Sequence, residues 1–387
     1  MSFEIAGPWL NRRYPVTLDP NIQPWPGQQY GTFGIVGDSC PDRWGEIIMT
    51  RREAIESRLQ GRPIKNLFKS DFLLGVDDRQ RMGGLRFKLE SDGPFLSDNT
   101  ELGAPPWARL RELESAAWSI QAADADENPA LGQWLNLLIA PGSSLGGARP
   151  KAGVCDEDGC LWIAKFPSQT DTADTQAWEM VTHELATNAG INIGEARLEK
   201  FGNQHKTFMV KRFDREVVDG ELQRIHFASA MTMLGHTDGN ADHGAGVSYL
   251  DIVEFLMKNS TAPECDIREL WRRIVFSICV ANTDDHLRNH GFLLGSDGWR
   301  LSPAYDLNPV PTGTGLSLNI SDEDNSLDLN LAMEVAEFFR LSNKEAKTIL
   351  DEVVAAVSNW EATATKYGLS RFEQQRMEPA FRRAKIQ

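Results

Sequence analysis

Cysteine is scarce in this chain, and the few cysteines show no ligand pattern. Five occur among 387 residues. Their number is odd, and no pair has the spacing of metal ligands. Cys155 and Cys160 flank an acidic turn and could face one another, but free thiols in a reducing cytosol are the favoured interpretation.

Long hydrophobic runs are missing as well. No apolar stretch approaches the ~18 residues that span a bilayer, and the mostly apolar residues 274–280 are better interpreted as core. The N-terminus, Met1 to Glu4, lacks a basic segment followed by an apolar run, so no signal peptide is expected. These features predict a cytoplasmic protein that has no membrane partner.

Basic residues are fewer than acidic ones, and the formal net charge is −15. A negative field of that size disfavours nonspecific binding to nucleic acid or to anionic membrane. The short basic runs at residues 51–52 and 382–385 are best interpreted as solvated helix faces. The composition, with 41% hydrophobic and 25% charged residues, is typical of a soluble globular protein, and the length suggests two or three domains.

Other catalytic signatures are absent from the sequence. The seven histidines show no zinc spacing, and no Gly-x-Ser-x-Gly elbow supports hydrolase chemistry. There is no internal repeat and no low-complexity tract. Evidence for the function must therefore come from the order of the predicted helices and strands and from a few polar residues.

Element patterns divide the chain into three segments. Residues 1–130 alternate short apolar segments with Pro- and Gly-containing turns, which predicts an α/β subdomain. It includes an expected strand at 84–90 and an expected helix that begins near Asp42. Residues 131–215 show a Gly-rich loop, a hairpin, a Lys-bearing strand, a helix and a strand, which is the order of a kinase small lobe. Residues 216–387 are mainly helical. The predicted fold class is therefore α+β, with an N-terminal α/β subdomain followed by a protein-kinase-like bilobal fold whose C-terminal lobe is mainly helical.

The most informative stretch carries Asp284 and, five positions later, Asn289, with a second aspartate, Asp306, farther on. Protein kinases use such a set for phosphoryl transfer: one Asp accepts the substrate hydroxyl proton, and the Asn and later Asp hold Mg²⁺ on the ATP phosphates. A helix that ends near Val280 would place the first two on a loop, and a hairpin over residues 292–301 would return Asp306 to that loop. Taken alone, Asp and Asn at this spacing are more often cap and turn residues.

The segment after Asp306 departs from the kinase pattern. A kinase would show Asp-Phe-Gly, whereas this chain has Asp306, Leu307 and Asn308. The metal-binding carboxylate is kept and the flexible glycine is lost.

Lys165 stands in an otherwise apolar expected strand. A lysine is costly to bury there without an anionic partner, and ATP phosphates would be that partner. The alternative is an edge strand from which Lys165 snorkels to water. Glu179, in the next expected helix, would either hold Lys165 in place or lie on the surface.

The loop at residues 143–151 is rich in small residues, and its backbone N–H groups could cradle phosphate. It matches neither standard glycine-rich nucleotide motif, so a plain turn is the alternative. His286, inside the catalytic stretch, would either touch a phosphate or be satisfied by backbone groups.

Taken together and in this order, the motifs resemble those of the HipA family, the serine/threonine-kinase toxins of bacterial toxin–antitoxin systems. The resemblance covers nearly the whole chain. The matching segments, in chain order, are Asp38 and residues 41–45, 84–87, 144–151, 163–167, 212–215, 283–289 and 304–306.

The resemblance implies a role for each matched residue. Asp284 would be the catalytic base, and Asn289 and Asp306 would bind Mg²⁺. Ser144, with Ser143 as its neighbour, matches the loop serine that family members autophosphorylate, which ejects the loop and stops ATP binding. The backbone near Lys211 and Phe213 would meet adenine. The residues expected to contact ATP are Lys165, Ser144, Gly146, Gly147, Lys211, Phe213 and His286.

The resemblance also implies partners. A small helix-turn-helix antitoxin, HipB-like, would carry the DNA contact, so that this acidic chain meets DNA only indirectly. The protein substrate would be a translation component such as an aminoacyl-tRNA synthetase. Two other functions stay open: a small-molecule kinase, which uses a similar Asp/Asn/Asp set, and a catalytically weak co-repressor that binds an antitoxin.

Overall fold

The predicted Lys-bearing strand is an inner strand of a four-stranded antiparallel sheet. In the computed structural model, β4 (Leu161–Lys165) pairs with β3 (Lys151–Cys155) and β6 (Thr207–Lys211), and β5 (Ala196–Glu199) pairs with β6. Because β4 has a neighbour on both sides, the alternative of an edge strand for Lys165 is wrong. The structure describes residues 2–11, 16–31, 33–98, 105–122, 125, 128, 130–138, 147–237 and 246–384.

The chain forms two compact units, each assembled from separate stretches of sequence. Unit 1 consists of Met1–Asp38, Trp178–Gly194 and Phe227–Gln387, and unit 2 of Ser39–Ala177 and Glu195–His226. The two units are discontinuous in sequence, whereas the three predicted domains are consecutive ranges; those three domains stay a prediction.

The turn between β3 and β4 forms as the acidic sequence predicts. Oδ1 of Asp156 accepts the backbone N–H groups of Asp158 (3.1 Å) and Cys160 (2.8 Å). Gly159 adopts a φ of 79°, which suits a residue without a Cβ atom. Cys155 and Cys160 are free thiols, as favoured.

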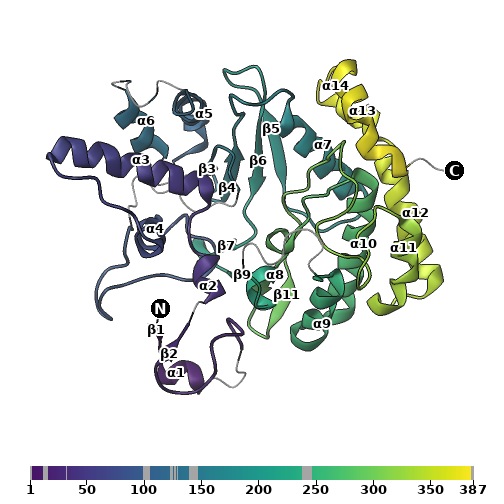
Figure 1. The fold of residues 1–387 in the computed structure, drawn as a ribbon, viewed down its shortest axis with the longest axis horizontal. Coiled ribbons are helices and arrows are strands. Elements are labelled where there is room, and N and C mark those ends of the chain that lie inside the picture. The colour runs from purple at the N-terminus through teal and green to yellow at the C-terminus, as the bar shows by residue number, and fades with distance from the viewer. Residues whose placement is uncertain are drawn as a thin grey trace. The chain divides into compact units, whose positions relative to one another are not determined.

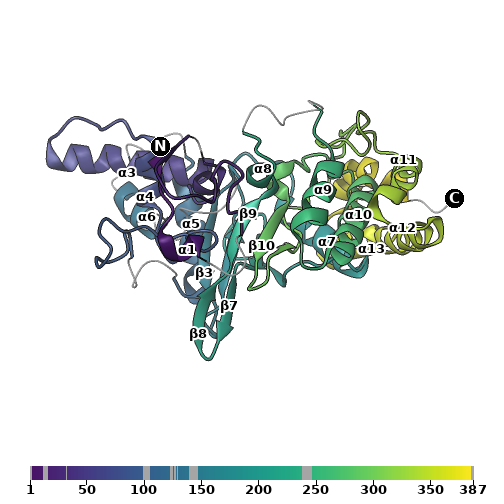
Figure 2. The same ribbon diagram turned by 90° about the horizontal axis from the view of Figure 1, so that it is seen from below.

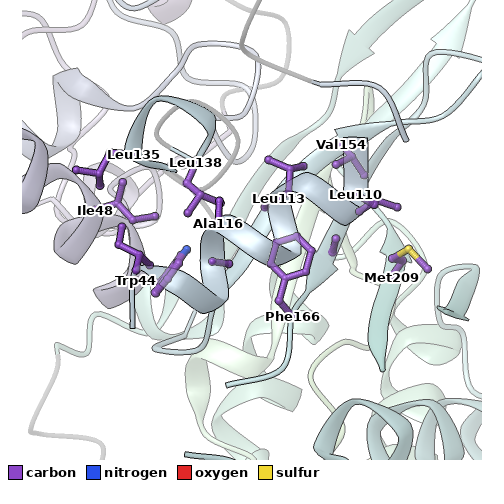
Figure 3. Packing of buried hydrophobic residues seen from close by; sticks show 14 of the residues in the cluster. Trp44, Ile48, Leu110, Leu113, Ala116, Leu135, Leu138, Val154, Phe166 and Met209 are labelled. Carbon is purple, nitrogen blue, oxygen red and sulfur yellow. The ribbon is translucent and has the colours of Figure 1, made fainter. Parts of the chain in front are cut away.

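The core of unit 2 lies on one face of this sheet. Helices α3 (Arg43–Gln60), α5 (Leu110–Ser119) and α6 (Leu131–Leu138) share one apolar cluster with strands β3, β4 and β6, as Figure 3 shows. Each large apolar side chain buried there contributes roughly 1.5–3 kcal/mol. Side chains alternate along a strand, so Lys165 lies on the face opposite Ala164 and the core. The cluster includes Trp44, Ile48, Leu110, Leu113, Leu135, Leu138, Val154, Trp162, Phe166 and Met209.

Helix α3 begins where the sequence predicts. The side chain of Asp42 accepts the backbone N–H of Gly45 (2.8 Å) as an N-cap, and Gly61 ends the helix at a φ of 60°. The hairpin β7–β8 projects from unit 2 (Figure 2). The other elements of unit 2 are α4 (Lys69–Gly75), η1 (Trp107–Arg109), β7 (Arg215–Val218) and β8 (Glu221–Arg224).

The strand predicted at residues 84–90 is wrong, and the segment ends in a turn. The segment makes one isolated bridge, between Lys88 and Phe95, and the Gly93 N–H closes the turn on Glu90 O (3.1 Å). At its start the Gly84 N–H donates to Nδ1 of His226 (3.3 Å) and is therefore engaged by a side chain rather than a neighbouring strand. An alternating pattern alone could not reveal that competing bond.

Unit 1 is organised around α10 (Pro263–Val280), whose residues from Leu270 to Val280 are buried except Arg272. It packs against α9 (Tyr249–Asn259) and α12 (Asn343–Val357) (Figure 1). A helix that is apolar nearly all round must be enclosed by others. The mainly helical character predicted for residues 216–387 is thus confirmed, and α12 is followed by α13 (Trp360–Lys366).

The hairpin predicted after the catalytic stretch is also confirmed. β10 (Gly291–Leu294) pairs antiparallel with β11 (Trp299–Leu301), and β9 (His226–Ser229) joins the far side of β10. Ala304 follows β11, and its N–H donates to Asn192 O (2.8 Å).

None of the described helices is both long and apolar enough to span a bilayer. Helix α7 (Thr175–Asn188) ends before Gly190, which adopts a φ of 75°. The remaining elements are β1 (Ser2–Phe3), α1 (Gly7–Leu10), β2 (Gln29–Tyr30), α2 (Gly34–Gly37), α7 (Thr175–Asn188), α8 (Ala230–Met233), η3 (Leu287–Asn289), α11 (Leu329–Glu334), η4 (Ala336–Phe339), α14 (Arg371–Met377) and η5 (Glu378–Ala384).

Candidate active site

The predicted catalytic loop begins at a left-handed residue that ends α10. Ala281 has a φ of 49°, its N–H donates to Ile278 O (3.3 Å), and the Asn282 N–H donates to Ser277 O (2.9 Å). An alanine in this conformation is strained by about 1 kcal/mol. The turn ends the helix abruptly and starts the loop that follows.

Asp284 projects into solvent from this loop. Its side chain is 77% exposed. Its carbonyl oxygen accepts the His286 N–H (3.1 Å) and Nδ2 of Asn289 (2.7 Å). Because Nδ2 is engaged inside the loop, Oδ1 of Asn289 is the atom that could ligate a metal.

His286 shows an unusual pattern of contacts. Nε2 lies 4.0 Å from Oδ1 of Asp284, while Nδ1 is buried and finds no hydrogen-bond partner among the described residues. A buried polar atom without a partner is costly. Among the described residues, no backbone group therefore satisfies Nδ1 of His286, contrary to the alternative stated above.

Asp285, next to the predicted base, turns inward instead. Its Oδ2 accepts the hydroxyls of Tyr249 (2.5 Å) and Ser277 (3.3 Å), and its Oδ1 lies 3.0 Å from Nε2 of His290. Burial alone would raise the pKa of Asp285, but His290 and these hydrogen bonds lower it below its usual value. Burial and the nearby Asp285 raise the pKa of Tyr249 well above its ordinary value. Asp285 is thus a buried carboxylate that is bonded on the inner side of the loop, whereas Asp284 faces solvent.

The segment with Asp306 returns to the catalytic loop. The Asn308 N–H donates to Oδ1 of Asn282 (3.1 Å), and the Val310 N–H donates to Ala281 O (3.1 Å). Nδ2 of Asn308 also donates to Oδ1 of Asp306 (3.3 Å), and Asp306 has a φ of 58°. The loop bearing Asp284 and the segment bearing Asp306 are therefore held together.

Asp38, a match in the N-terminal part, supports the same loop indirectly. Its carboxylate accepts the N–H (2.8 Å) and the hydroxyl (2.7 Å) of Ser229, the N-cap of α8. The next N–H, that of Ala230, donates to His290 O (2.8 Å). The backbone at the end of the catalytic loop is thereby fixed.

In unit 2, Lys165 stands directly opposite Lys151 across the β3–β4 pair. Like charges at such positions destabilise a sheet. Nζ of Lys151 is matched by Oδ2 of Asp42 (2.9 Å) and by the carbonyl of Gly147 (2.9 Å), and its side chain is almost fully buried. Burial raises the pKa of Asp42, although Lys151 opposes that rise. Nζ of Lys165 lies 5.9 Å from the Phe208 ring centroid.

The Gly-rich loop is seen only at its end. Gly147 adopts a φ of 93° and its carbonyl is held by Lys151, which gives this end of the loop a defined conformation. Ser143, Ser144 and Gly146 lie outside the described residues.

The predicted adenine segment follows β6. The Lys211 N–H donates to Glu195 O (2.8 Å) and the Arg212 N–H to Leu161 O (2.9 Å), so both donors are committed to protein. The register pairs Lys211 with Trp162, so the Lys211 side chain lies on the face opposite Lys165. Phe213, which follows, is partly buried.

A buried ionic cluster fixes this segment. Asp214 accepts Nε (2.8 Å) and Nη2 (2.7 Å) of Arg212, Nη1 of Arg215 (2.6 Å) and the Gly83 N–H (2.8 Å). Burial alone would raise the pKa of Asp214, but the charges of Arg212 and Arg215 with these hydrogen bonds lower it to about 2. The side chains of Arg212 and Arg215 also donate to the carbonyls of residues 80 and 79, so the residues on either side of Phe213 are tied to residues 79–83.

Glu179 is 7% exposed, so the alternative of a surface glutamate is wrong; its pairing with Lys165 stays a prediction. In the part of the chain that the structure describes, no group of three or more His, Cys, Asp or Glu side chains is arranged to hold a metal ion. Asn289 and Asp306 each carry hard oxygen donors, which are the ligand type of Mg²⁺ rather than of zinc.

Sequence reasoning missed the supporting residues of the loop. Tyr249, His290 and Asn282 carry no motif of their own, and Tyr249 lies on a separate helix. The sequence pointed to them only through the two adjacent aspartates at positions 284 and 285. Spacing alone could not show which of the two side chains points outward and which points inward.

Comparison with known proteins places the chain in a family. A family model described as HipA-like C-terminal domain matches residues 143–360, more than half of the chain. The matched range contains Lys165, Asp284, Asn289 and Asp306, and it leaves the N-terminal segment outside.

Curated relatives match parts of the chain. The protein named "Putative kinase Y4mE" of Sinorhizobium fredii is 28% identical over 149 residues, 38% of this chain and 33% of its own length. "Putative kinase" of Haemophilus influenzae is 28% identical over 34% of this chain and 41% of its own length. "Putative kinase Y4dM" of Sinorhizobium fredii is 27% identical over 52% and 54%. The chain thus spans between a third and about half the length of these relatives.

A solved structure shares the fold over nearly the whole chain. It is HipA of Shewanella oneidensis, from a complex with HipB and operator DNA, which aligns with a TM-score of 0.62 and 16% identity over 98% of this chain and 89% of that one. This likeness confirms the predicted α+β fold class.

Proposed function

The chain belongs to the HipA-like C-terminal domain family, and on that premise we propose that it is an ATP- and Mg²⁺-dependent serine/threonine protein kinase that acts as the toxin of a toxin–antitoxin system. The observation that carries the proposal is the arrangement of one loop. It projects Asp284 outward, turns Asn289 inward against the Asp284 carbonyl, and is bonded through Asn282 and Asn308 to the segment with Asp306.

Each residue has a distinct task in this proposal. Asp284 orients the substrate hydroxyl and accepts its proton, for which an exposed carboxylate on a fixed backbone is suited. Oδ1 of Asn289 and the carboxylate of Asp306 would hold Mg²⁺, which neutralises phosphate charge when bound. His286, whose buried Nδ1 lacks a described partner, would meet a phosphate or a water near it.

The nucleotide would be held by residues of unit 2. Lys165 would bind the phosphates, and the Gly-rich loop with Gly146 and Gly147 would cover them. The N–H groups of Lys211 and Arg212 are used within the sheet, so an adenine contact from this segment would come from carbonyls or from Phe213.

The partners follow from the family in the same way. We infer a small helix-turn-helix antitoxin, HipB-like, because the structural neighbour was solved with HipB and operator DNA. The net charge of −15 supports DNA contact through that partner rather than through this chain. The substrate would be a translation component such as an aminoacyl-tRNA synthetase, and Ser144 the site of autophosphorylation, with Ser143 as the alternative.

Phosphate transfer from labelled ATP tests the proposal. The full chain with Mg²⁺ is incubated with lysate proteins and, separately, with a metabolite extract. Protein labelling that disappears in both Asp284→Asn and Asp306→Asn is expected, because each removes a charge used in transfer. Asp297→Asn, the same change on the exposed β10–β11 turn, serves as the matched control and retains full activity.

Three outcomes count against the proposal. Undiminished transfer by either variant would remove the residue roles. Labelling of metabolites alone would indicate a small-molecule kinase, and ATP binding without any transfer would indicate a co-repressor. Mass spectrometry of the peptide with Ser143 and Ser144 tests autophosphorylation, and an unmodified peptide from ATP-treated active protein would reject it.

A further inference from the structure

Two adjacent aspartates of the catalytic loop have opposite environments. The side chain of Asp284 is 77% exposed, and that of Asp285 is 3% exposed. Asp284 lies in a turn that the His286 N–H closes on the Asp284 carbonyl (3.1 Å), so the direction of its side chain depends on how the backbone of the next residues is held. The contacts of Asp285 hold that backbone.

Asp285 is bound from three separate elements. Tyr249 donates from the start of α9, Ser277 donates from the last turn of α10, and His290 faces it from the residue before β10. Tyr249 also packs edge-on against His290, with ring centroids 5.6 Å apart. Three elements thus converge on one carboxylate beneath the loop.

The contacts continue from this carboxylate to the Asp306 segment. Ser277 Oγ accepts Nδ2 of Asn282 (3.4 Å), and Oδ1 of Asn282 accepts the Asn308 N–H (3.1 Å). Nδ2 of Asn308 then donates to Oδ1 of Asp306 (3.3 Å). Asn308 stands where a protein kinase has glycine, and its side chain makes the last link.

We propose that Asp285 and Asn308 are positioning residues of one buried hydrogen-bond network, which holds the Asp284 loop and the Asp306 segment in register for transfer. Asp285 anchors the loop, and Asn308 orients the carboxylate of Asp306. The inference deepens the proposed function and rests on it for the kinetic consequences, but the anchoring itself is independent of any activity.

The charge and burial of Asp285 make it a firm anchor. A buried carboxylate whose Oδ2 accepts two hydroxyls loses much when it is removed, because the donors of Tyr249 and Ser277 are left without a partner. The lowered pKa of Asp285 agrees with a carboxylate that stays ionised among those donors. A misplacement of about 1 Å at a reacting group costs roughly 100-fold in rate.

Hydrogen exchange tests the anchor without reference to activity. In Asp285→Ala, amide exchange of residues 281–290 is expected to rise by roughly tenfold or more, because local opening becomes easier. Asp266→Ala is the matched control. Asp266 is another buried aspartate of unit 1, held by Arg300, Ser260 and the Leu301 N–H, and it does not touch the loop. Its loss should leave exchange at 281–290 unchanged.

Kinetics test the positioning role. At a temperature where all variants stay folded, Asp285→Ala should lower kcat by roughly 100-fold and leave the KM for ATP within about threefold. Asp285→Asn keeps an acceptor for Tyr249 and Ser277 and should recover part of that loss. Asn308→Ala keeps its backbone bond to Asn282, so it should raise the Mg²⁺ concentration needed for half-maximal rate while exchange at 281–290 stays as in the wild type.

The outcomes separate this inference from the proposed function. Unchanged exchange at 281–290 in Asp285→Ala would overturn the anchor, whether or not the chain is a kinase. If exchange rises but the wild type transfers no phosphate, the proposed function fails and the anchor stands. If Asp285→Ala and Asp266→Ala lower kcat equally, or Asn308→Ala leaves the Mg²⁺ dependence unchanged, the positioning role is wrong.

Discussion

The ionic cluster around Asp214 gives a large and measurable stability effect. Asp214, fully enclosed, accepts four hydrogen bonds from Arg212, Arg215 and the Gly83 N–H. Asp214→Asn leaves two buried guanidinium groups without their counter-charge. Breaking a buried pair in this way costs about 3–5 kcal/mol. We therefore expect unit 2 to lose about that much of its free energy of unfolding.

Urea unfolding at pH 7 measures the loss. With a slope of about 2 kcal/mol per molar urea for a domain of this size, the midpoint for unit 2 should fall by roughly 1.5–2.5 M. Exchange of amides in β3, β4 and β6 during the titration assigns the transition to this unit. Asp158→Asn, on the exposed β3–β4 turn, is the matched control and should change stability by less than about 0.5 kcal/mol. A midpoint shift below roughly 0.5 M in Asp214→Asn would refute the reasoning.

The same cluster predicts a pH dependence with a definite sign. The pKa of Asp214 falls from 3.8 to about 2 on folding. A group whose pKa is lowered by folding stabilises the folded state above its unfolded pKa and loses that stabilisation as pH falls through its folded pKa. A shift of this size corresponds to about 2 kcal/mol, which should be lost between roughly pH 4 and pH 2. In Asp214→Asn this part of the acid dependence should be missing, as urea midpoints measured at pH 5, 4 and 3 would show.

Three further changes follow from single contacts. If Lys165 binds the ATP phosphates as proposed, Lys165→Met should lower kcat/KM for ATP by roughly 100-fold in steady-state assays while the melting temperature stays near that of the wild type. Glu114→Gln should cost about 1–3 kcal/mol in urea unfolding, since a donor replaces the oxygen that accepts the Thr207 hydroxyl (2.5 Å). Gly291→Ala should lower stability by about 1–3 kcal/mol in thermal unfolding, because a Cβ there would lie 2.2 Å from the Phe227 ring.

Much of the fold could be predicted because its elements obey local rules. Helix α10 is long and apolar, and the hairpin after it is bounded by a Gly-Ser-Asp-Gly turn, so both were found from periodicity and turn residues alone. The Lys-bearing strand was found in the same way, but its place inside the sheet was not, because pairing with β6 joins segments about 45 residues apart. The wrong strand at 84–90 failed for a related reason, since its first N–H is bonded to the distant His226.

At the candidate site, too, features set by nearby sequence were predictable and those set by distant residues were not. Spacing predicted that Asp284 and Asn289 share a loop and that a hairpin carries Asp306 back, and these relations depend on chain connectivity. Spacing could not show that Glu179 is buried, because helix periodicity in α7 left both faces plausible.

The doubled aspartate at positions 284 and 285 marks the limit of that reasoning. The sequence shows only that Asp285 adds a second negative charge next to Asp284. In the structure Tyr249, Ser277 and His290 take up this carboxylate on the inner side of the loop, and only Asp284 of the pair faces solvent. None of the three partners belongs to the motif, since they come from α9, α10 and the approach to β10. The direction of a loop side chain is set by what lies beneath the loop, and here that information is spread over 42 residues of chain from Tyr249 to His290.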